Sequence, residues 1–436
     1  MLVFKRAHTF NNENVSLGGI VLKRKKNIFF SIVSLFIITF VLSACSENSS
    51  GSSEDGDTIK LGVLEDRSGD FALVGMQKSH AIELAVEEIN ENDGLLGKKI
   101  EVIAPDTQSD DNRYQEMARK LILEDEVDVI MGAFSSASRE AIRPIMEEHE
   151  MLYFYNNQYE GGVASKYTFP TGAVPEHQVT TIMEYMIEEY GPNVYTIAAD
   201  YNFGQITADW VKVAAEEFGG EIVGEEFIPL GESQFNSSIN KIQKAKPDFL
   251  MVLLTGEKQS SFYEQWNTQG IKDLPLATTI NMAQQYEHIR TEAPALANMH
   301  VAAPFMEELD TPEAEEFVEK FREKFPDDDY VGMEAEAQYT GVHLWAKAVE
   351  EAGTTDVDEV IAELENDITW EAPSGSVSID PKSHHAIKDV YLFNADNEHN
   401  ISTVHEWEQV EPYWLHEEKG VDLTEDSPNE QYTPID

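Results

Sequence analysis

The sequence is poor in cysteine and in basic residues, and each shortage excludes a class of function. Cys45 is the only cysteine in 436 residues, so neither an intrachain disulfide nor a cysteine-rich metal site can form. Lys and Arg number 31 against 81 Asp and Glu, which gives a formal net charge of -50. A chain this acidic repels phosphate backbones, so no nucleic-acid partner is expected. By contrast, 42% of the residues are hydrophobic, enough for the cores of two domains.

The sequence motifs of common enzymes are also missing. The chain contains no G-x-S-x-G, no H-E-x-x-H and no G-x-x-x-x-G-K-[ST]. His384 and His385 are adjacent in an extended segment, where neighbouring side chains point to opposite faces, so joint metal ligation is not expected. We therefore expect a protein that is not an enzyme and that holds no metal and no cofactor.

The amino terminus has the pattern of a secretory signal. A basic cluster at residues 23–26 precedes an apolar run at residues 28–41, and small residues lead up to Cys45. This arrangement resembles the lipobox of bacterial lipoproteins, in which the cysteine is lipidated; an uncleaved membrane anchor is the alternative. One hypothesis places the true translation start near Val21. The globular part would then be held at the outer face of the cytoplasmic membrane. The predicted segments are a signal peptide at residues 1–44 and a lipidated tether at residues 45–57.

Strand and helix patterns alternate along the rest of the chain. Residues 58–64 alternate apolar and polar side chains, and residues 76–91 carry apolar side chains at helical spacing. The same alternation resumes at residue 194, so the sequence predicts an α/β protein with two parallel sheets, each covered by helices. Residues 411–436 are polar with scattered prolines, which predicts a loosely held C-terminal tail.

Polar loops follow several of these strands, where open parallel sheets bind their ligands. Hydroxyls and helix-start N–H groups at residues 132–136 suit a carboxylate or a carbonyl oxygen, although a plain helix cap explains them too. Amides and phenols at residues 155–161 suit a neutral polar ligand; an Asx-rich turn is the alternative. Residues 200–204 offer one carboxylate and two aromatic walls. The candidate binding residues in these loops and after the later strand are Phe134, Ser135, Ser136, Tyr155, Asn156, Asn157, Gln158, Asp200, Tyr201, Phe203 and Thr255.

Residues 58–410 resemble the type I periplasmic solute-binding proteins of ABC importers, in particular the branch that binds urea and short-chain amides. The motifs that carry the resemblance are IKLGVLEDRSG at 59–69, GLLGK at 94–98, GAFSS at 132–136, QYEG at 158–161, DYNFG at 200–204, LDTP at 309–312 and GVHLWAKAVEEAGTT at 341–355.

The resemblance implies two Rossmann-like lobes joined by three crossing strands, with ligand bound between them and a membrane permease as partner. It adds Glu334 to the candidate residues. A monomer is expected, although the sequence itself does not fix the oligomeric state. The amide-binding relatives have proline and threonine where Asn156 and Asn157 stand, so this pocket is expected to be more polar. The implied lobes are residues 58–173 with 304–355 and residues 174–303 with 356–410.

Three functions stay open at this point. The first is a transport receptor for urea or a short amide, and the second is one for branched-chain or other amino acids. The third is a ligand sensor that signals to a partner receptor. In each case the ligand is a small neutral or zwitterionic solute.

Overall fold

The computed structural model describes residues 58–256, 259–271 and 273–435. The predicted signal peptide, Cys45 and the tether lie outside these residues. None of the helices described there combines the length and the apolar character needed to cross a membrane.

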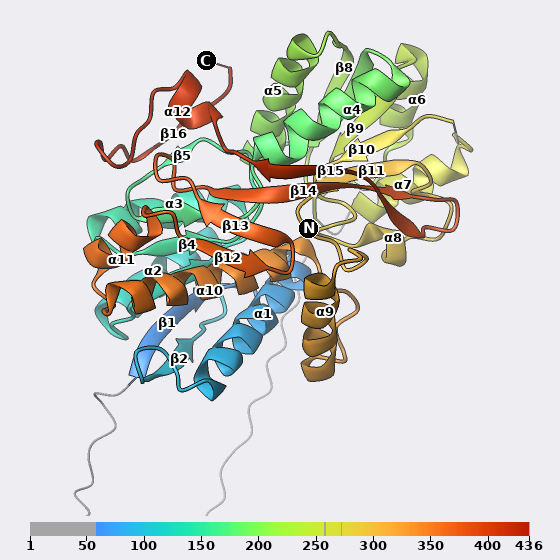
Figure 1. Cartoon of the computed structure of the whole chain (residues 1–436). Coiled ribbons are helices and arrows are strands. Elements are labelled where there is room, and N and C mark those ends of the chain that lie inside the picture. Colours follow the sequence, from blue (N-terminus) through green and yellow to red (C-terminus); the bar gives the residue numbers. More distant parts are fainter. Residues whose placement is uncertain (1–57, 257–258, 272, 436) are drawn as a thin grey trace, which may run out of the picture. The chain divides into compact units, whose positions relative to one another are not determined.

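The first sheet has five parallel strands in the order β2-β1-β3-β4-β6 (Figure 1). Its strands are β1 (Thr58–Leu64), β2 (Lys99–Ile103), β3 (Val129–Gly132), β4 (Tyr153–Tyr155) and β6 (Thr168–Pro170). Its helices are α1 (Ala72–Glu91), α2 (Asp111–Leu123), α3 (Ser136–Glu148), α9 (Pro312–Lys324), α10 (Met333–Ala352) and α11 (Val357–Leu364).

Side-chain alternation along the strands divides these helices between the two faces of the first sheet. Val129 and Met131 pack into the core that contains α1 and α10, whereas Ile130 packs into the core that contains α2 and α3. In β4 the two tyrosines face α2 and α3, and Phe154 faces the opposite side. The strands β3 and β4 are buried on both faces, as central strands of parallel sheets are, and read as short apolar runs.

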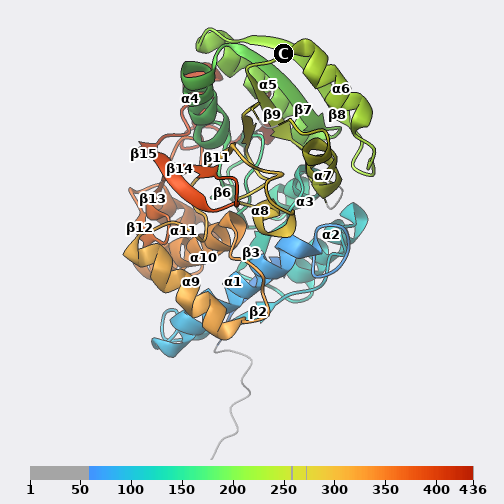
Figure 2. The same cartoon turned by 90° about the vertical axis from the view of Figure 1, so that its right-hand side faces the viewer.

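The second sheet is mixed, in the order β12-β13-β14-β11-β10-β9-β7-β8, with β15 paired to β14. Its parallel strands are β7 (Asn193–Ala199), β8 (Glu221–Ile228), β9 (Phe249–Leu253), β10 (Leu276–Thr278) and β11 (Met299–Ala303). Its antiparallel strands are β12 (Thr369–Ala372), β13 (Gly375–Ile379), β14 (Ala386–Ala395) and β15 (Ile401–Val410). The helices nearby are the π-helical turn η1 (Glu176–Thr180), α4 (Thr181–Tyr190), α5 (Asn202–Glu217), α6 (Asn236–Ala245), α7 (Ser260–Thr268) and α8 (Glu287–Arg290). Figure 2 shows α6 beside β8.

The chain passes between the two sheets after β6, after β11 and between α11 and β12, which confirms the predicted two-sheet α/β architecture. The boundary expected between residues 355 and 356 does not match the packing. Val360, Ile361 and Leu364 of α11 are buried in the core that contains α10, so this helix lies with the first sheet. Their spacing gives α11 one apolar face, and α10 is the partner that covers it.

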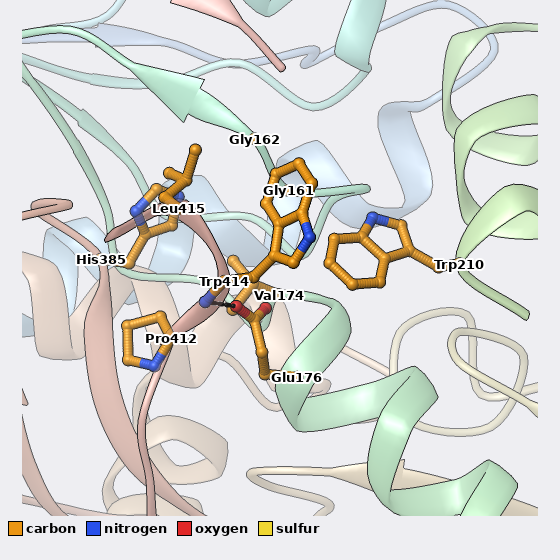
Figure 3. A pocket seen from close by; sticks show the side chains of 9 residues that line it. All are labelled: Gly161, Gly162, Val174, Glu176, Trp210, His385, Pro412, Trp414 and Leu415. Atoms are coloured by element: carbon orange, nitrogen blue, oxygen red, sulfur yellow. Dashed lines mark hydrogen bonds between the residues drawn. The ribbon is translucent and has the colours of Figure 1, made fainter. Parts of the chain in front are cut away.

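The C-terminal segment is docked onto the fold, which corrects the prediction of a loosely held tail. Trp414 and Leu415 of α12 (Trp414–Glu418), together with Val421 and Leu423, are buried in the core of the second sheet. The Trp414 ring meets the Trp210 ring edge-on, with 4.8 Å between centroids (Figure 3). Burial of these apolar side chains gives the segment a fixed position that its polar composition does not suggest.

The end of the same segment reaches the loop that follows β4. Strand β16 (Glu430–Gln431) pairs antiparallel with β5 (Val163–Ala164), and the Tyr432 N–H donates to the Gly162 carbonyl at 2.8 Å. Gly162 has a φ of +85°, and a Cβ there would lie 2.0 Å from the Tyr432 carbonyl oxygen. A glycine is therefore required for this close approach.

Candidate functional site

A cavity of about 260 Å³ lies where strand-end loops of the two sheets meet. Asp66 and Phe71 come from the loop after β1, and Ser135 comes from the loop after β3. Tyr201 and Leu230 come from the loops after β7 and β8 of the second sheet. All of these loops leave the carboxyl ends of parallel strands, which is where open α/β sheets place their ligands.

Hydrogen bonds to the Phe134 carbonyl connect the loop after β3 with the end of β4 and the loop that follows it. The Tyr155 hydroxyl donates to this oxygen at 2.9 Å, and the Asn157 Nδ2 donates to it at 3.1 Å. Ser135 caps α3, because its Oγ accepts the Ser138 N–H at 3.0 Å. The Oδ1 atom of Asn157 is buried and has no hydrogen-bond partner in the described part of the chain, so it is available to a ligand N–H group.

Glu334, near the start of α10, connects the two halves of the site. Its carboxylate accepts the Gln158 N–H at 3.1 Å and the Gln284 Nε2 at 2.7 Å. Gln158 follows β4 and Gln284 follows β10, so one side chain receives hydrogen bonds from both sheets' loops. Burial raises the pKa of Glu334 to about 7, although Lys78 and these two donors oppose the shift.

The second sheet supplies an aromatic wall. Tyr201 precedes α5, and its ring lies 6.0 Å from the Phe203 ring between centroids. The Thr255 hydroxyl accepts the Gln285 Nε2 at 3.3 Å and interacts with the Tyr201 side chain. Burial raises the pKa of Tyr201 above its ordinary value, so this phenol stays protonated and can donate to a ligand oxygen.

A buried ion pair supports the loop after β4. Arg139 Nη2 lies 2.8 Å from Glu160 Oε1, and both side chains are fully buried. The Arg139 guanidinium also lies over the Tyr159 ring, 4.5 Å from its centroid. Ser136 donates its hydroxyl to the other Glu160 oxygen, and Trp210 Nε1 donates to the Glu160 carbonyl at 2.9 Å. Glu160 is thus held by residues from both lobes.

The structure brings most of the predicted residues together and places three elsewhere. Asn156 points away, because its amide bonds to the Thr171 hydroxyl and lies against Gly341 of α10. Side chains alternate along the extended segment, so Asn156 and Asn157 face opposite ways. Asp200 is exposed and accepts the Gln205 Nε2 at 2.8 Å. The Ser136 hydroxyl is committed to Glu160. Of the other predicted residues, Ser135 and Tyr201 line the cavity. Hydrogen bonds and ring contacts within the neighbouring loops involve Phe134, Tyr155, Asn157, Gln158, Phe203, Thr255 and Glu334.

Sequence reasoning missed several residues of the site. Asp66 and Phe71 follow β1 by the same rule that selected the later loops, and applying it there would have found them. Gln284 and Gln285 lie in a segment without a strand or helix pattern, so no sequence signal pointed to them. Within the described residues, no group of three or more His, Cys, Asp or Glu side chains is placed to hold a metal ion.

Comparison with known proteins defines the class. Residues 58–400 match the periplasmic binding protein family, and the chain belongs to that family. It is similar to the Leu/Ile/Val-binding protein homolog 6 of Brucella abortus, with 24% identity over 346 residues, 77% of this chain and 87% of the relative. These proteins are solute-binding proteins and not enzymes, as the missing motifs predicted.

Two solved structures show the same fold. One is a solute binding protein of an ABC transporter from Rhodopseudomonas palustris in complex with 3,4-dihydroxy benzoic acid, with a TM-score of 0.72, 23% identity and coverage of 81% of this chain and 98% of that chain. The other is a branched-chain amino acid transporter substrate binding protein from Streptococcus pneumoniae in complex with isoleucine, with a TM-score of 0.71, 22% identity and coverage of 80% and 99%. The chain therefore has the type I periplasmic binding protein fold.

Proposed function

We propose that this chain is the substrate-binding component of an ABC importer, which captures urea or a short-chain amide between its two lobes and delivers it to a membrane permease. Two observations carry the proposal: the buried Glu334 carboxylate accepts hydrogen bonds from loops of both sheets, and Asn157 Oδ1 is buried without a partner in the described part of the chain. Both are acceptors suited to the N–H groups of an amide or urea, and the Tyr201 phenol is a donor suited to the carbonyl oxygen. The proposal also includes a lipid anchor at Cys45 and a monomeric state, both of which are expected from the sequence.

The mechanism follows from linkage between binding and closure. A solute that contacts Asn157 from one lobe and Tyr201 from the other interacts more strongly with the closed form than with the open form. It shifts the open–closed equilibrium only by that difference in affinity. The closed form is then the state that docks on the permease. The third function considered above, a sensor, uses the same closure with a different partner.

Amino-acid binding is the second candidate, and the named relatives favour it. The Brucella relative is named as a Leu/Ile/Val-binding protein homolog, and the Streptococcus structure holds isoleucine. In that case the α-ammonium group would bind at Glu334, and the carboxylate would bind at the amino-terminal end of α3, which begins after Ser135.

Calorimetric titration with urea, formamide, acetamide, leucine and glutamine separates the two candidates. We expect binding of urea or an amide and no binding of leucine; the reverse pattern would replace the first candidate by the second. Asn157→Ala should weaken binding of the active ligand by about one to two orders of magnitude, because it removes a buried acceptor. Asp200→Ala is the matched control, since Asp200 is exposed outside the site. Equal affinity of the Asn157 variant and the parent protein would exclude this loop as the site.

A further inference from the structure

The C-terminal strap, residues 412–436, is fixed to the second sheet at its first end. The four buried apolar side chains of its first half lie in the core that also contains Phe249 of β9. The Leu423 N–H donates to the Lys382 carbonyl at 2.9 Å. The strap lies outside residues 58–400, which match the family, so membership of the family assigns it no role.

The other end of the strap is fixed to the first sheet. Asn429 Oδ1 accepts a hydrogen bond from the Arg143 guanidinium of α3. Strand β16 pairs with β5, in which Val163 is buried in the core that contains α2 and α3. Gln431 Nε2 donates to Glu160 Oε1 at 2.7 Å, in the loop after β4. The strap therefore contacts the loop that carries part of the proposed ligand site.

Between these two ends the strap packs where the chain first passes from one sheet to the other. Glu176, at the start of η1, accepts the Trp414 N–H at 3.1 Å. Val174, Glu176 and Pro412 line the same small cavity (Figure 3). Because the strap has one anchor on each sheet, a hinge rotation at this crossing would move the two anchors relative to each other.

The strap is docked in a conformation in which loops of the two sheets meet. Ser135, from the first sheet's loops, and Tyr201, from the second sheet's loops, line one cavity. Trp210 Nε1, on α5, donates to the Glu160 carbonyl at 2.9 Å. Contacts that span both sheets in this conformation stabilise it relative to any conformation in which the lobes separate, by the free energy of the contacts that are lost there.

We propose that the strap is a further link between the lobes, beyond the three crossings of the chain, and that it shifts the open–closed equilibrium towards the closed form. A solute then has to supply less of the free energy of closure, so its apparent affinity is higher than it would be without the strap. This inference goes beyond the proposed function and rests on it only in that closure captures the solute.

Two variants release the first-sheet end of the strap and leave α12 in place. Deletion of residues 429–436 removes the first-sheet contacts but keeps the four buried apolar side chains, so the variant is expected to fold. Gly162→Ala places a Cβ 2.0 Å from the Tyr432 carbonyl oxygen and therefore displaces β16. Gly219→Ala is the matched control, because its φ of +77° gives similar backbone strain and nothing lies within 4 Å of its Cβ.

Distances between the lobes test the inference without a ligand. Spin labels are attached at Glu116→Cys in α2 and Gln243→Cys in α6, both exposed, in a chain that carries Cys45→Ser so that no other thiol reacts. In Figure 2 these two helices lie on the right, away from β14 and β15 on the left. Double electron–electron resonance on the unliganded protein should show a mean distance longer by more than about 2 Å in both strap variants than in the parent protein. Gly219→Ala should match the parent protein.

Calorimetry with acetamide and leucine, one probe for each candidate class of ligand, measures the effect on affinity. We expect both strap variants to bind the active probe about fivefold more weakly than the parent protein, a loss comparable to that of one hydrogen bond. Gly219→Ala should bind it with the affinity of the parent protein.

The outcomes separate this inference from the proposed function. Unchanged or shorter distances in the strap variants would overturn the inference, whatever the affinities are. Longer distances with an unchanged affinity would overturn the link to ligand capture. If neither probe binds, the proposed function fails for these ligands, and the distances alone decide the role of the strap: longer distances would support it.

Discussion

Replacing Glu176 by Gln should change how the stability of the protein depends on pH. Glu176 begins η1 and is buried beneath the C-terminal segment, where its Oε1 accepts the Trp414 N–H at 3.1 Å; the dashed line in Figure 3 marks this bond. Burial raises its pKa from 4.5 to about 7. A glutamine side chain keeps an acceptor oxygen for Trp414 and removes the titrating proton.

The sign of the effect follows from proton linkage. Between the two pKa values the folded protein binds more protons at this group than the unfolded chain does, so the free energy of unfolding falls as the pH rises. With a pKa of 4.5 in the unfolded state and about 7 in the folded state, the loss between about pH 5 and pH 8 is about 2.5 kcal/mol. Glu176→Gln should escape this loss, so the variant gains about 2.5 kcal/mol relative to the parent protein over the same interval.

Urea denaturation at pH 5 and at pH 8 measures the difference directly. The parent and the variant should have similar stabilities at pH 5, and the variant should be the more stable at pH 8. The control is the same substitution at an exposed position, and Glu217→Gln should leave the pH dependence of stability unchanged. A stability difference between parent and Glu176→Gln that is the same at both pH values would refute the reasoning, because it would mean that Glu176 titrates as an exposed group.

Two further predictions, one on a substitution and one on a deletion, concern the stability of the fold. Glu160→Gln leaves the buried Arg139 without its 2.8 Å partner, and although Glu140 partly compensates, we expect a loss of about 2–3 kcal/mol in unfolding free energy. Combining it with Arg139→Met should recover much of that loss; a double variant as unstable as the single one would contradict the ion-pair account. Deleting residues 412–436 removes four buried apolar side chains of the C-terminal segment, a cost of about 6 kcal/mol at about 1.5 kcal/mol each. Thermal unfolding should show a large drop in Tm, and an unchanged Tm would mean that the segment does not stabilise the fold.

Much of the architecture could be predicted from local patterns. The buried strands β3 and β4 are short apolar runs, and α10 has apolar side chains along almost its whole length, so both features are visible in the sequence. The strands β14 and β15 were not predicted individually. The residues of β15 are mostly exposed and polar, so their strand conformation depends on pairing with β14 and not on a local signal.

The errors at the site and in the tail have a common physical origin. Choosing Asn157 over Asn156 requires knowing which residue ends β4, because a shift of one residue exchanges the two faces. Trp414 and Leu415 stand in a polar stretch, and Trp414 packs against Trp210, some two hundred positions earlier in the chain. Interactions of this kind are decided by tertiary packing, which a window of neighbouring residues does not contain.

The order of the strands along the chain has a consequence for biosynthesis. The helices α9 and α10, which cover the first sheet, follow the parallel strands of the second sheet in the chain. Strand β14, which pairs with β11, comes near the carboxyl end, at Ala386–Ala395. A ribosome makes these parts in sequence, so β11 exposes an unpaired edge until β14 has been synthesised. Neither lobe can complete its packing during synthesis. The nascent chain therefore exposes surfaces that favour aggregation until its carboxyl-terminal residues have been made.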